Sequence, residues 1–109
     1  MAFLPTLKLS SVTSNVTFVV PAGYSINQLI IESTNENAVT GGLRLGTTDG
    51  GTDVVLSLSV AGNSLQIVSD ATLLKRVFSF SSDQTLYIQA VTLWNSASLN
   101  IYFVLCKLK

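Results

Sequence analysis

The chain of 109 residues contains no histidine and only one cysteine, Cys106. A lone cysteine excludes an internal disulfide. The absence of histidine removes the base that most often activates a cysteine or serine nucleophile. The surrounding residues, YFVLCKL, are typical of a buried strand in which a free thiol packs as a small hydrophobic group. No paired-carboxylate signature stands out either, so we predict a protein that is not an enzyme and needs no cofactor.

Charged residues are scarce as well. They make up 11% of the chain, against about 25% in typical soluble domains, and six positive charges balance six negative ones. A neutral surface with few charges favours association, so we predict a homo-oligomer or a component of a larger particle. The alternative is a monomer with a surface of serine, threonine and asparagine. Lys75 and Arg76 form the only adjacent basic pair, which is too little for a nucleic-acid interface.

Long hydrophobic runs are missing too. No segment reaches the roughly 18–20 apolar residues of a membrane-spanning helix. Residues 1–9 (MAFLPTLKL) lack the basic leader and cleavage site of a secretory signal, and we expect no membrane partner. Residues 1–6, with Phe3, Leu4 and Pro5, are predicted to form an assembly arm, which leaves residues 7–109 as one domain.

The clearest local pattern in the sequence is a β-hairpin over residues 41–60. Leu43 and Leu45 alternate with polar or small residues, and Val54, Leu56, Leu58 and Val60 alternate in a second, longer run. Between the two runs, residues 47–52 (TTDGGT) favour a chain reversal because glycine tolerates positive φ and Asp and Thr hydrogen-bond locally.

Alternation of this kind recurs along the whole chain and predicts eight or nine short strands, with turns every 8–12 residues or so. We therefore predict an all-β fold: a single-domain antiparallel β-sandwich, jelly-roll-like. An immunoglobulin-like sandwich is the second choice, although its Cys…Trp…Cys spacing is absent. Residues 70–75 carry the only helical start signal, which predicts one short helical turn packed through Leu73 and Leu74.

The last strand breaks the usual pattern. Its second face begins polar, at Ser98 and Asn100, and then becomes apolar. A strand that is apolar on both faces is buried on both, so something must cover the outer face. We predict an oligomer interface there, extended by other apolar residues on polar faces: Tyr102, Val104, Cys106, Leu108, Val19, Ile30 and Val55. The alternative is that the N-terminal arm folds over this face within one chain.

Two further features suggest binding sites. Asp49 and Asp53 flank a glycine pair and offer oxygen ligands for Ca²⁺, but their spacing does not reproduce a known calcium loop, and turns often contain Asp. Tyr24, Trp94 and Asn95 suggest a lectin-like glycan contact. The alternative for Trp94 is that it plugs one end of the sandwich, because tryptophan is usually largely buried.

The segments VPAGY, GGLRLGTTDGGTDVV, DATLLKRVFS and TLYIQAVTLWNSASLNIYFVL resemble small structural proteins and fibre domains of tailed bacteriophages. The resemblance spans roughly residues 16–105. It implies a virion protein that decorates or attaches to a capsid or tail, forms a trimer, has capsid or tail proteins as partners and carries no catalytic residues. The other function we consider is a carbohydrate-binding module for host-surface glycans, and the chain is too short for a complete fibre.

Overall fold

A computed structural model of the protein describes residues 6–69, 73, 77–79 and 81–108. Within these residues it contains strands and turns, and no segment forms an apolar helix of membrane-spanning length. The nine strands are β1 (Thr6–Val12), β2 (Val16–Val20), β3 (Tyr24–Ser33), β4 (Leu43–Gly46), β5 (Val55–Leu58), β6 (Leu65–Ser69), β7 (Phe78–Ser79), β8 (Gln84–Ala90) and β9 (Leu99–Lys107).

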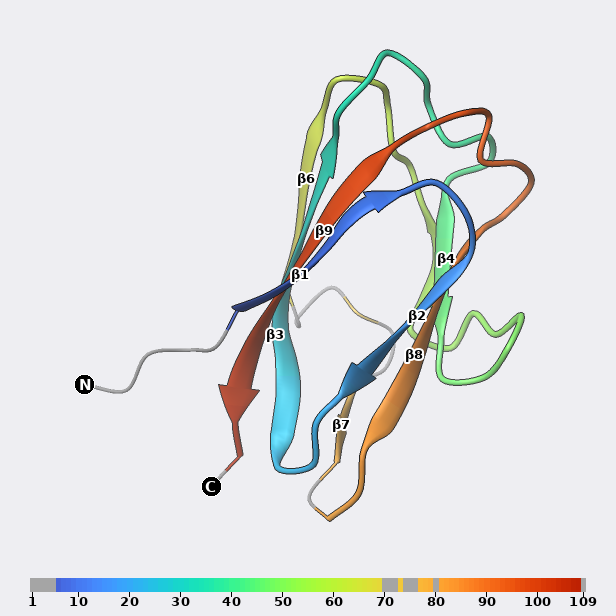
Figure 1. Ribbon diagram of the computed structural model, residues 1–109. Coiled ribbons are helices and arrows are strands. Elements are labelled where there is room, and N and C mark those ends of the chain that lie inside the picture. Colours follow the sequence, from blue (N-terminus) through green and yellow to red (C-terminus); the bar gives the residue numbers. More distant parts are fainter. Residues whose placement is uncertain (1–5, 70–72, 74–76, 80, 109) are drawn as a thin grey trace.

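The strands form two antiparallel sheets that face each other, as Figure 1 shows. Sheet A has the order β1-β9-β3-β6, with β7 paired to β3, and sheet B has the order β2-β8-β4-β5. The pairs β1·β9, β2·β8, β3·β6 and β4·β5 are nested one inside the next along the chain. Nested pairs of this kind arise when one long hairpin wraps around to form two facing sheets. This arrangement is a jelly roll. The predicted fold class is confirmed.

The core lies between the sheets and follows directly from strand alternation. Side chains on a strand point alternately to its two faces, so every second residue of β9 enters the core. Leu99, Ile101, Phe103 and Leu105 are each at most 1% exposed. The ring of Phe103 stacks on that of Phe18 in the opposite sheet, with centroids 3.7 Å apart. This aromatic contact joins sheet A to sheet B at the centre of the sandwich.

The predicted hairpin is present as β4 and β5, but its second strand differs from the prediction. Leu43 pairs with Leu58, whereas Leu45 pairs with Val55, so the register shifts between the two pairs. An extra residue in one strand reverses which side chains face inward. As a result Val55 packs against the core, and Leu56 is 64% exposed. The assignment of Val55 to an outer face and of Leu56 to the inner one is therefore wrong.

Two predictions concern segments outside the described residues. The helical turn at residues 70–75 is one of them, although Leu73 itself packs against the core as expected. The arm residues Phe3, Leu4 and Pro5 are the other. The described chain begins at Thr6, which is already the first residue of β1.

Candidate functional site

The outer face of sheet A carries a row of apolar side chains across the three strands β9, β3 and β6. Cross-strand partners lie on the same face of an antiparallel sheet. Tyr102 of β9 is paired with Lys8 of β1 and with Ile30 of β3, and Ile30 is paired in turn with Ile67 of β6. The neighbouring rows add further apolar residues. We call the set the outer apolar face: Ile30, Leu65, Ile67, Tyr102, Val104 and Cys106.

Exposure is greatest at the β6 edge of this face. Leu65 and Ile67 are each 59% exposed, which is unusual for such large apolar side chains in a folded domain. The register of sheet A explains their direction. Leu29 and Ile31 point into the core, so Ile30 and its partner Ile67 must point outward. The outward position of Ile67 is thus set by its pairing with β3.

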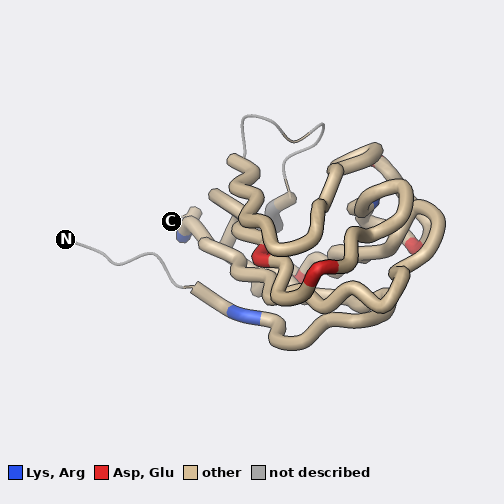
Figure 2. Tube along the Cα trace, turned by 90° about the horizontal axis from the view of Figure 1, so that it is seen from above, with Lys and Arg blue, Asp and Glu red and all other residues tan. Residues whose placement is uncertain are grey.

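Polar groups border the outer apolar face. The Lys8 ammonium lies 5.2 Å from the centre of the Tyr102 ring, within range of a cation–π interaction. In the row next to Tyr102, the Asn100 amide donates to Glu32 Oε1 at 3.0 Å and its Oδ1 accepts from the Ser11 N–H at 3.1 Å. Figure 2 shows charged residues scattered singly along the trace, without a basic or acidic cluster among the residues it describes. An apolar centre with a thin polar rim is typical of a protein–protein contact.

The structure places the predicted interface residues on more than one surface. Tyr102, Val104 and Cys106 share the outer face of sheet A. Val19 lies on the outer face of sheet B and is 47% exposed. Leu108 follows β9, and its N–H donates to the Gly23 carbonyl at 2.8 Å. The set therefore does not form one continuous patch.

Leu65 and Ile67 were not predicted from the sequence to be interface residues. In the segment LQIVS these two residues alternate with Gln66, which favours placing them inward. The structure instead directs Val68 into the core, where it is 8% exposed. No signal within this short segment identifies the outward face, because only the pairing with β3 decides it.

The three residues predicted to contact glycans lie at opposite ends of the sandwich. Tyr24 begins β3, next to the β2–β3 turn at the bottom of Figure 1, and pairs with Lys107. Trp94 and Asn95 lie in the β8–β9 loop at the other end. Both have structural partners: Trp94 Nε1–H donates to Asn15 Oδ1 at 2.8 Å, and the Asn95 amide donates to the Ala38 carbonyl at 3.2 Å. They do not form one surface with Tyr24.

The two aspartates of the β4–β5 loop also have separate partners. Asp53 accepts hydrogen bonds from the backbone and side chain of Thr47, and so holds the start of the loop. Asp49 Oδ1 accepts from the Gln89 amide at 2.7 Å. Within the described ranges, no three metal-ligating side chains gather in one place.

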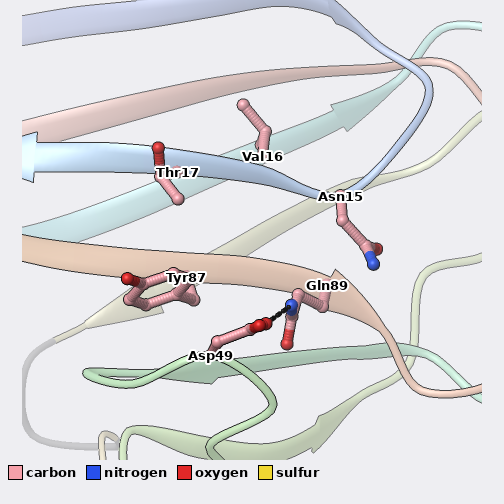
Figure 3. A pocket seen from close by; sticks show the side chains of 6 residues that line it. All are labelled: Asn15, Val16, Thr17, Asp49, Tyr87 and Gln89. Carbon is pink, nitrogen blue, oxygen red and sulfur yellow. Dashed lines mark hydrogen bonds between the residues drawn. The ribbon is translucent and has the colours of Figure 1, made fainter.

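Asp49 instead lines a polar pocket on the outer face of sheet B. Its volume is about 440 Å³, and its lining comes from β2 and the turn before it, from β8 and from the β4–β5 loop. In Figure 3 the lining residues of β8 lie between those of β2 and its preceding turn on one side and Asp49 on the other. They are Asn15, Val16, Thr17, Asp49, Tyr87 and Gln89.

Fold and surface together define the class of protein: a jelly-roll β-sandwich with an apolar outer face on sheet A and a polar pocket on sheet B. Jelly rolls serve as capsid subunits, lectins and enzymes, so the fold alone does not select a function. Comparison with known protein families, characterised proteins and solved structures found no match.

Proposed function

We propose that this protein is a non-enzymatic structural subunit whose copies associate through the outer apolar face, and that it serves in a phage virion as a decoration or attachment protein. The observation that carries the association is the row Tyr102–Ile30–Ile67 on the outside of sheet A. The virion role is supported by the sequence resemblance and by the jelly-roll fold, which is common in capsid proteins.

A second copy of the chain fits this face better than a charged partner does. The chain has no net charge. Among the described residues of this face, Lys8 is the one cation, at the β1 end of the row, and Glu32 is the one anion, in the neighbouring row. With so little charge, copies of this face can pack against one another around a symmetry axis. Burial of an exposed side chain such as Ile67 contributes roughly 1.5–3 kcal/mol, so a few of them can offset the entropic cost of association.

The test replaces Ile67 with aspartate and measures the mass in solution by light scattering. Ile67 lies on an edge strand and is 59% exposed, so the monomer should fold normally. A charge buried without a partner in the interface is strongly unfavourable. We expect the unmodified protein to be an oligomer, a trimer according to the resemblance, and Ile67→Asp to have the 11.6 kDa mass of one chain.

The matched control is Val19→Asp, which puts the same charge at an exposed β-branched position on sheet B. This variant should keep the oligomer. The proposed interface would be contradicted if the unmodified protein were monomeric at all concentrations. It would also be contradicted if Val19→Asp dissociated while Ile67→Asp stayed oligomeric. Mass spectrometry of purified phage particles from the source of this sequence tests the virion role: the protein must be present as a stoichiometric component.

A further inference from the structure

We propose that the polar pocket on sheet B binds one ring of a neutral saccharide. None of Tyr24, Trp94 and Asn95 lines this pocket, which lies on the sheet opposite the outer apolar face. Its volume of about 440 Å³ falls within the roughly 300–1,000 Å³ of small-molecule sites. Every lining residue except Val16 carries a hydrogen-bonding side chain, which suits a ligand covered with hydroxyl groups.

The orientation of Asn15 is fixed. Its Oδ1 accepts from the Ala90 N–H at 3.1 Å and from the Trp94 Nε1–H at 2.8 Å. Both of these groups are donors only, so the amide cannot be turned around. The Nδ2 group therefore has no partner among the described residues and is available as a donor beside the pocket (Figure 3).

The β4–β5 loop is held in place by Gln89. This side chain is 7% exposed, and its Oε1 accepts from the Gly50 N–H at 2.9 Å and from Arg44 Nε at 3.3 Å. Its amide donates to Asp49 Oδ1, which leaves Oδ2 of that carboxylate without a partner in the described part of the chain. A loop that is already ordered loses little entropy when a ligand binds. The pocket thus presents a fixed donor at Asn15 and a fixed acceptor at Asp49.

The chemistry of these groups favours a neutral sugar. Adjacent hydroxyls of a sugar ring can each donate to a carboxylate oxygen and accept from an amide N–H. The ring of Tyr87, between Thr17 and Asp49 in Figure 3, offers an aromatic face to the C–H groups of the same sugar. The carboxylate of Asp49 disfavours anions such as phosphate or sialic acid. Tyr87, Asp49 and Asn15 are the residues we assign to recognition.

The test is a titration of isotope-labelled protein, in which backbone amide NMR shifts report binding. The ligands are the methyl glycosides of glucose, galactose and mannose, and N-acetylglucosamine. We expect at least one sugar to give saturable shifts at millimolar concentration, centred on Thr17, Gly50 and Tyr87. The affinity should fall at least tenfold in Tyr87→Ala and in the conservative variant Asp49→Asn. Thermal unfolding of each variant shows that the fold is retained.

The matched control is Asp83→Asn, which removes a carboxylate from the turn before β8. This control should bind the sugar as the unmodified protein does. Shifts that stay linear with every sugar, shifts centred elsewhere, or an equal loss of affinity in Asp83→Asn would overturn the proposal. The mass measurements on Ile67→Asp concern the other sheet, so they are independent of this result.

Discussion

At the scale of single residues, Gln89 shows how one buried polar side chain orders a surface loop. Its amide group makes hydrogen bonds with Gly50, Arg44 and Asp49, three residues from β4 and the loop after it. A buried polar group is stable only when it has such partners. Every buried side-chain nitrogen and oxygen in the described residues has one. Gln89 therefore links β8 to the loop that carries Asp49.

Replacing Gln89 with leucine should lower the free energy of unfolding by about 1–3 kcal/mol, because the Gly50 N–H and the Asp49 carboxylate lose their partner. Urea unfolding measures the change. The control Gln84→Leu removes an amide whose one hydrogen bond within the described residues is to the carbonyl of its neighbour Thr85, and it should change stability by less than about 0.5 kcal/mol. Equal effects of the two variants would show that Gln89 does not hold the loop.

At the scale of elements, the β4–β5 hairpin needs glycine at Gly42 for two separate reasons. Gly42 has a φ of +84°, and a Cβ atom there would lie 2.5 Å from the Leu58 carbonyl oxygen of the paired strand. Gly50 has a similar φ of +76°, but nothing lies within 4 Å of the place where its Cβ would be. A substitution at Gly50 therefore tests backbone strain alone, whereas a substitution at Gly42 tests backbone strain together with close packing.

Gly50→Ala should cost only the roughly 1–2 kcal/mol of a left-handed conformation. Gly42→Ala should cost this amount and about 1–3 kcal/mol more, because the neighbouring backbone has to move. Thermal or urea unfolding of the two variants gives the difference. A Gly42→Ala variant as stable as Gly50→Ala would mean that the two strands do not approach as closely as described.

Elements also show what could be predicted from the sequence. Period-two alternation was sufficient for β2, β8 and β9, because each of them has one face made almost entirely of apolar residues. It failed where pairing overrides the local pattern. The register shift in β5 turned Val55 inward, and pairing with β3 turned Leu65 and Ile67 of β6 outward. These facts depend on partners distant in the sequence, which a short segment does not reveal.

The candidate sites, too, were predictable where a local pattern defines them and not where distant segments come together. The unusual second face of β9 was visible in the sequence and led to Tyr102, Val104 and Cys106. Its continuation on β3 and β6 required the strand order of sheet A. The polar pocket was not predicted, because Asn15, Asp49 and Tyr87 are far apart in the sequence and become neighbours only in the jelly roll. Single aspartates and asparagines in turns give no signal of such a site.

At the scale of the whole molecule, low charge and an apolar outer face point to the same arrangement. A domain with 11% charged residues and no net charge has little electrostatic repulsion between its copies. Large exposed apolar patches on folded domains mark interaction surfaces. The outer apolar face lies on one sheet and the polar pocket on the other, so self-association and ligand binding can occur together.

The most direct test of the central claim uses Cys106, the only cysteine and a member of the outer apolar face. The rate of its reaction with a maleimide reports whether this face is covered in solution. We predict slow labelling in the unmodified protein and in Val19→Asp, and labelling at least tenfold faster in Ile67→Asp. Equal, fast labelling of all three proteins would show that the outer face of sheet A is open, and would contradict the account.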